Sequence, residues 1–128
     1  GGIPVQLGGS PDVISRIDEY TSAQTNVAVI TVAAGTIILI LEVMFTCSKA
    51  NTLTTTARVG FGATTTPALG SVGLVAGHAG MGAESGIRDG DCSSVIGRGT
   101  DGQDLRITCT DPGGVLWVAT KYLVLTTG

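Results

Sequence analysis

The stretch NVAVITVAAGTIILILEVMF, residues 26–45, is the most apolar part of this 128-residue chain. A membrane-spanning helix needs about 20 consecutive, mostly apolar residues. The run from Val27 to Leu41 is shorter than that, Thr31 and Gly35 interrupt it, and Glu42 follows it directly. Val, Ile and Thr dominate the stretch, and their stiff side chains suit a pleated sheet better than a helix. The sequence therefore predicts β-strands here and no membrane span.

Two strand-like runs, Asn26–Ala33 and Thr36–Ser48, flank Ala34-Gly35. Glycine readily adopts the turn conformations that other residues resist. We therefore expect the two runs to pair as a β-hairpin. Alternation in the second run predicts one wholly apolar face, made of Ile37, Leu39, Leu41, Val43, Phe45 and Cys47. The opposite face is mixed and contains Ile38, Ile40, Glu42, Met44 and Thr46.

Further strands follow along the chain. Alternating patterns predict strands over 53–61 and 105–110, with a shorter strand over 93–99. The glycine-rich segment 63–92 is expected to be a long connection, with one irregular strand near Val72–Ala76. After the turn sequence DPGG, the segment 115–127 is apolar on both faces, which predicts a strand covered on both sides, one of them by another subunit.

Composition sets the fold class and excludes one class of partner. Only 13% of the residues are charged, about half the usual fraction, while 43% are hydrophobic. Such a weakly charged surface is typical of a chain covered by partners or by copies of itself. A net charge of -3 without a cluster of Lys or Arg argues against nucleic acid. We predict an all-β chain: a single antiparallel β-sandwich, with the jelly roll as one way of winding it.

The beginning of the chain is expected to lie outside the sandwich. Residues 1–12 are predicted to form a flexible N-terminal arm, and residues 13–128 the β-sandwich domain. The arm lacks the basic start and long apolar run of a secretory signal, and a chain that begins with Gly indicates trimming or a tag. The segment SPDVISRIDEY, residues 10–20, allows either a short capped helix or an opening edge strand, and we favour the strand.

No catalytic, cofactor or metal site is expected from the sequence. Glu84, Asp89 and Asp91 cluster, but they lack the spacing of a calcium loop and are interpreted as part of a solvated loop. His78, the single histidine, is expected in a loop that matches no nucleophile motif.

The three cysteines form no CxxC pair. Cys47 and Cys109 are predicted to be buried in strands, whereas Cys92 is predicted to lie in a polar loop.

Several segments together resemble small β-rich virion structural proteins of tailed bacteriophages and phage-like particles. The segments are EYTSAQTNVAVITVAAGT (19–36), ARVGFGATTTPA (57–68), GHAGMGAESG (77–86), GRGTDGQDLRITC (97–109) and GGVLWVATKYLV (113–124). The likeness covers residues 19–125 and consists of strand and turn signatures. It implies a trimeric β-sandwich or jelly roll located in the virion, on the capsid surface or tail, and assembled in the host cytoplasm.

We therefore expect a non-enzymatic virion protein. The first expectation is a capsid decoration protein, of the cement or head-fibre type, that binds the major capsid protein or other virion subunits as a homo-oligomer. The alternative is a tail-fibre, spike or glycan-binding module. By position alone, the residues expected to bind partners are Ile3, Pro4, Val5 and Leu7 in the arm, and His78 and Arg88 in the 63–92 segment.

Overall fold

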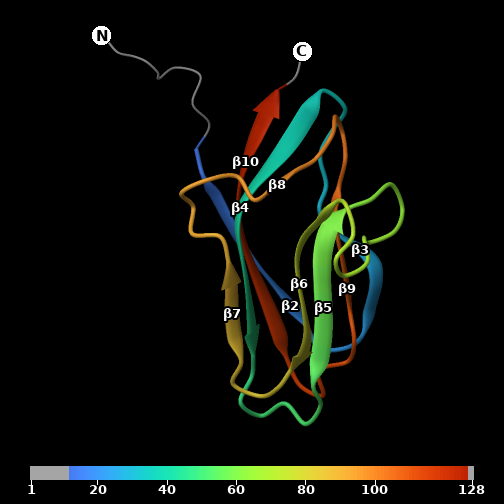
Figure 1. Cartoon of the computed structure of the whole chain (residues 1–128), viewed down its shortest axis with the longest axis vertical. Helices are drawn as coiled ribbons and strands as arrows, with labels where there is room; N and C mark the ends of the chain where they lie inside the picture. The colour runs from blue at the N-terminus through green and yellow to red at the C-terminus, as the bar shows by residue number, and fades with distance from the viewer. Residues whose placement is uncertain (1–11, 127–128) are drawn as a thin grey trace.

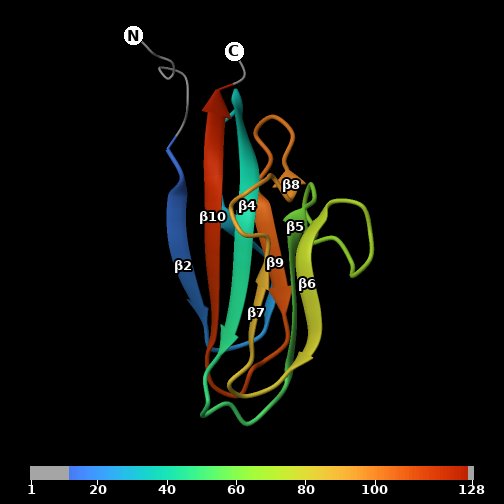
Figure 2. The same cartoon turned by 60° about the vertical axis from the view of Figure 1, so that its left-hand side comes forward.

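The computed structural model describes residues 12–126, which form two antiparallel β-sheets packed face to face (Figures 1 and 2). One sheet has the order β2-β10-β4-β7, and β8 also pairs with β4. Its strands are β2 (Ile14–Tyr20), β10 (Leu116–Thr126), β4 (Thr36–Cys47), β7 (Gly86–Asp89) and β8 (Gly97–Arg98). The other sheet has the order β3-β9-β5-β6 and consists of β3 (Gln24–Ile30), β9 (Leu105–Cys109), β5 (Thr55–Phe61) and β6 (Leu74–Met81). The predicted all-β sandwich is confirmed.

The core lies between the two sheets and is filled by alternate residues of the long strands. Because successive side chains of a strand point to opposite faces, each strand contributes every second residue to this layer. The fully buried apolar side chains come from both sheets: Ile38, Ile40, Val43, Phe45, Leu116 and Val118 from the first, and Ala57, Val59, Leu105 and Ile107 from the second. The alternation predicted for β5 and β9 is therefore confirmed.

The predicted hairpin is wrong, although both of its strands exist. β3 pairs with β9, whereas β4 pairs with β10, β7 and β8, so the two runs belong to opposite sheets. The turn at Ala34-Gly35 is present, and Gly35 has a positive φ of 86°. Instead of folding the chain back within one sheet, this turn carries it across the sandwich. Among residues 12–126, no helix is long and apolar enough to cross a membrane.

The single apolar face predicted for 37–47 is also wrong, because β4 contains a β-bulge. Lys121 pairs with Glu42 and the next residue, Tyr122, pairs with Ile40, so Leu41 is an extra residue. An extra residue reverses the alternation of a strand. Val43 and Phe45 are therefore buried after the bulge, but Ile38 and Ile40 are buried before it.

Residues 63–92 are not one long connection. They contain β6, which is longer than the irregular strand expected near Val72–Ala76, and the separate strand β7. His78 consequently lies in a strand and not in a loop. The strand expected over 93–99 shrinks to Gly97–Arg98.

Two further interpretations of the sequence agree with the structure. Residues 14–20 form an edge strand and not a capped helix. Cys47 and Cys109 are buried, and Cys92 is exposed in the loop between β7 and β8. The predicted arm lies almost wholly outside the described residues.

Candidate interaction surface

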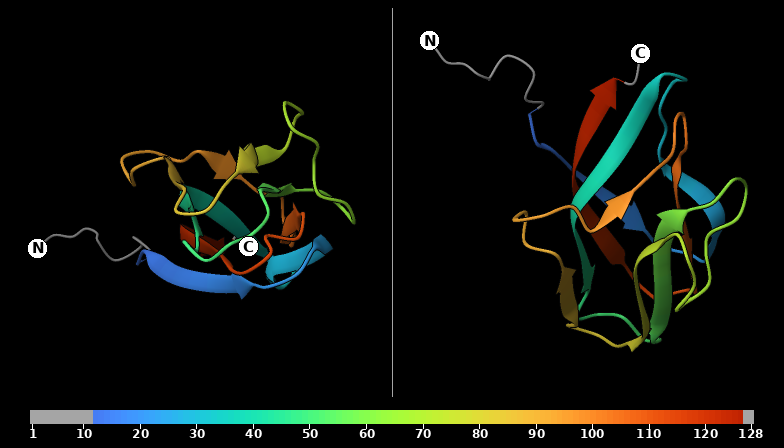
Figure 3. Two further views of the ribbon diagram at one scale, coloured as in Figure 1. Left: turned by 90° about the horizontal axis from the view of Figure 1, so that it is seen from below. Right: turned by 45° about the horizontal axis from the view of Figure 1, so that its top comes forward.

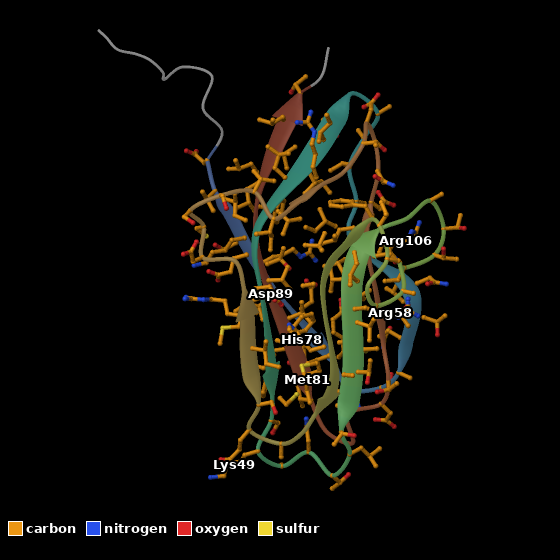
Figure 4. All side chains as sticks on the ribbon, viewed as in Figure 1. Lys49, Arg58, His78, Met81, Asp89 and Arg106 are labelled. Atoms are coloured by element: carbon orange, nitrogen blue, oxygen red, sulfur yellow. The ribbon has the colours of Figure 1, made fainter. Side chains whose placement is uncertain are left out.

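The outer face of the β3-β9-β5-β6 sheet is partly covered by the chain itself. The segment 62–73 lies over it, held by Arg58, whose Nη1 donates to the carbonyl oxygens of Thr66 (2.7 Å) and Pro67 (2.9 Å). The backbone N–H of Thr66 also donates to Asn26 Oδ1 at 2.7 Å, and Thr66 is only 5% exposed. Arg58 and Arg106 both lie on this sheet (Figure 4). The segment therefore covers the part of this face around Asn26 and Arg58.

The outer face of the β2-β10-β4-β7 sheet has no such cover, and we call it the open face. Apart from the 90–96 loop at its β7 and β8 edge, no segment within residues 12–126 lies over it (Figure 3). By register and alternation, its side chains are Ser15, Ile17 and Glu19 of β2, Trp117, Ala119, Lys121, Leu123 and Leu125 of β10, Ile37, Leu39, Glu42, Met44 and Thr46 of β4, Arg88 of β7 and Arg98 of β8.

The open face is apolar along its middle. Ile17, Ala119 and Met44 lie side by side across β2, β10 and β4, and Ile17 is 73% exposed while Met44 is 36% exposed. Leu123 and Leu39 form another apolar pair further along the same two strands. Exposed, contiguous apolar surface of this kind marks a site of association in most water-soluble proteins.

Charged side chains on the open face separate into two flanks. The one central pair is Lys121 with Glu42, whose charged atoms are 3.9 Å apart. On the β2 flank, Glu19 is exposed and carries negative charge. Arg88 and Arg98, on the β7 and β8 flank, are exposed and carry positive charge. The flanks are thus opposite in sign.

His78 and Arg88, which the sequence placed in one loop, point in different directions. His78 Nε2 lies 2.6 Å from Asp89 Oδ2, and the His78 ring meets Phe45 edge to face at a centroid distance of 5.7 Å. Since His78 is in β6 and Asp89 in β7, this contact joins the two sheets (Figure 4). Arg88 lies on the other side of β7, on the open face. The arm residues Ile3, Pro4, Val5 and Leu7 lie outside the described residues, so their role stays a prediction.

The acidic residues considered for calcium do not converge. Asp89 bonds His78, whereas Asp91 accepts hydrogen bonds from the backbone N–H and the hydroxyl of Ser93. These bonds to Ser93 lower the pKa of Asp91. Glu84 lies in the turn before β7, and residues 12–126 hold no group of three potential metal ligands.

Burial shifts the pKa values of two thiols and one phenol. It raises the pKa of Cys47 and of Cys109, and it raises the pKa of Tyr20 to about 12. In each case desolvation disfavours the ionised form.

The sequence patterns did not identify Met44, Ile17 or the partner of His78. The phase of β4 shifts at the bulge, and the signal for that shift was present, because Glu42 interrupts the apolar run where the extra residue lies. Asp89 could not be assigned to His78 because the two strands belong to different sheets.

Comparisons with known proteins give weak likenesses only. No protein-family model and no curated protein matches the chain. Among solved structures, it is similar to a protein of the Bacillus endospore appendages described as disulfide-linked pili, with a TM-score of 0.41 and 12% identity over 98% of this chain and 100% of that one. It is also similar to a chain of the infectious bursal disease virus Gt strain (TM-score 0.37, 13% identity, 98% of this chain and 37% of that one). A third similarity is to the infectious bursal disease virus VP2 subviral particle (TM-score 0.36, 14% identity, 100% and 38%).

The chain spans little more than a third of the two viral chains. Scores this low do not establish a shared fold. The three similar chains come from an endospore appendage and from virus particles. The narrower resemblance to tailed-phage proteins stays a prediction.

Proposed function

We propose that this chain is a non-enzymatic structural protein of a virion, of the capsid decoration type, which associates through its sandwich and anchors to the capsid lattice. The observation that carries the proposal is the open face. An apolar sheet face with exposed Ile17 and Met44 is typical of a site where another protein binds. Trp and Met, both present on this face, are enriched at protein interfaces.

The winding of the sandwich supports the same role. Chain neighbours β2 and β3 lie in opposite sheets, as do β3 and β4, and the last strand β10 inserts between β2 and β4. We infer from this order, β2-β10-β4-β7 facing β3-β9-β5-β6, that the chain is a jelly roll, a fold found in viral capsid and lectin domains.

The anchor is proposed to be the N-terminal arm. Ile3, Val5 and Leu7 alternate with Pro4 and Gln6, a pattern that fits a strand added to the edge of a partner's sheet. Several copies bound together would hold the lattice by avidity. If this protein binds the assembled lattice but not the separated subunits, its binding raises the free energy needed to separate capsid subunits.

Cryo-electron microscopy of virus particles purified from a host that produces this protein tests the proposal. Density for the sandwich on the capsid lattice, lost when residues 1–11 are deleted, is the expected result. Absence of the chain from purified, intact particles would refute a virion role, and density confined to the tail would refute decoration.

A further inference from the structure

Within residues 12–126, the open face is not covered by another segment along its middle, whereas the 62–73 segment covers part of the opposite outer face. The question is what covers the open face. Two features of this face bear on the answer: an apolar centre and two flanks of opposite charge.

We infer that the open face binds a second copy of this chain, face to face across a two-fold axis parallel to the strands. Such an axis places the β2 flank of each copy opposite the β7 and β8 flank of the other. Glu19, which is level with Trp117, then lies closest to Arg88 of the partner, which is level with Ala119. Arg98 is level with Leu123, further along the strands. Because a two-fold contact is self-complementary, the pairing of a negative β2 flank with a positive β7 and β8 flank occurs twice in the dimer.

The exposed charged side chains of the open face differ in sign between the two flanks, while Arg16 and Asp18 of β2 pair with each other and Asp89 of β7 contacts His78. The β2 flank carries Glu19 and, just before the strand, Asp12, both exposed. The β7 and β8 flank carries Arg88 and Arg98, and the neighbouring Asp91 offsets only one of these two charges. Charge complementarity of this kind fixes the orientation of partners and disfavours wrong ones.

The centre of the face is suited to sheet packing. Ile17, Ala119 and Met44 form one row and Trp117 lies in the next. Two sheets that pack face to face lie about 10 Å apart and interdigitate apolar side chains. The small Ala119 leaves room between Met44 and Ile17 for a side chain of the partner. Trp is one of the residue types that contribute most to the binding energy of protein interfaces.

This inference deepens the proposed function by naming the self-association surface, and its test uses purified full-length chain without any capsid. Sedimentation velocity over a concentration series measures the association constant. The wild-type chain should form dimers, and Arg88→Glu and Glu19→Arg should each weaken association about tenfold or more, because each places like charges opposite one another.

The decisive variant combines both changes. Glu19→Arg with Arg88→Glu restores opposite charges across the axis and should return the dissociation constant to within about threefold of wild type. Lys49→Glu and Glu84→Arg, which make the same charge changes in turns off the open face, serve as matched controls and should leave association unchanged. Thermal unfolding of each variant shows that it is folded.

Three results would overturn the inference. One is a chain that stays monomeric over the whole concentration range. Another is a trimer or higher oligomer whose stability does not respond to either single charge reversal. The last is a double variant no better than the single ones. Binding of the open face to capsid subunits only would appear as a monomer in this assay and therefore counts against the inference, while leaving the proposed function intact.

Discussion

Tyr20 shows how the core makes this protein sensitive to alkali. Its ring is buried at the end of β2, and burial raises the pKa of its phenol to about 12. An unfolded tyrosine ionises near pH 10. The stability that neutral Tyr20 provides is therefore complete below pH 10 and is lost as the pH rises towards 12.

Replacing Tyr20 with Phe removes this loss. At pH 11 the wild-type chain should have lost about 1.4 kcal/mol through Tyr20, since one unit of pKa is worth about that much. Urea unfolding of both chains at pH 8 and pH 11 measures the difference. Burial also raises the pKa of Cys47 and of Cys109, and both thiols are present in the two chains. An equal alkaline loss in the two chains would contradict the assignment to Tyr20.

The His78–Asp89 contact is the residue-scale link between the sheets. The two atoms are 2.6 Å apart and both side chains are mostly buried. A double-mutant cycle with His78→Ala and Asp89→Ala should give a coupling energy of about 1.5 to 3 kcal/mol in urea unfolding, the range of a hydrogen bond to a charged group. A coupling energy near zero would show that the edge between β6 and β7 is held by packing alone.

At the scale of elements, the bulge at Leu41 organises the edge of the first sheet. β7 pairs with β4 after the bulge and β8 pairs with it before the bulge. The chain between them turns at Gly90, which has a φ of 79°, and the N–H of Cys92 donates to the carbonyl oxygen of Leu41. The two short strands thus depend on a tight turn beside the bulge.

Replacing single glycines with alanine distinguishes two effects: a clash of the new Cβ with a neighbouring atom, and the strain of a positive φ. A Cβ at Gly90 would clash with the carbonyl oxygen of Leu41, whereas a Cβ at Gly80 would meet no atom, although Gly80 has a φ of 66°. Gly82 has neither constraint. Thermal unfolding should rank the losses Gly90→Ala, then Gly80→Ala at about 1 kcal/mol, then Gly82→Ala near zero. Equal losses at Gly90 and Gly80 would show that the contact with Leu41 adds nothing.

Elements were easier to predict than their partners. Alternation identified β5, β9 and β10 because each is regular, with one face towards the core. Pairing failed for β3 and β4 because their main partners, β9 and β10, lie near the other end of the chain. Local spacing around Gly35 predicts a turn but does not show whether the chain stays in one sheet. The bulge at Leu41 then moved Ile38 and Ile40 from the expected mixed face into the core, whereas Met44 stayed on the face opposite Val43 and Phe45.

For the whole molecule, the two outer faces carry the functional argument. In a monomer, residues 62–73 cover part of the outer face of one sheet, while Ile17 and Met44 on the other outer face are exposed to water. Because both faces of β10 are apolar, the sequence predicts that another subunit covers one of them. In the structure, that face of β10 is part of the open face. The arm and the open face would then serve different partners, the capsid and a second copy.

The central claim, that the open face is covered when the protein functions, can be tested with its two methionines. Met44 lies on the open face and is 36% exposed, while Met81 is in the core and 3% exposed. The measurement is the rate of oxidation of each by hydrogen peroxide, followed by mass spectrometry, in dilute and in assembled protein. We predict that Met44 oxidises much faster than Met81 in the dilute chain and slows about tenfold or more on assembly. Oxidation of Met44 at the same rate in both states would contradict the account.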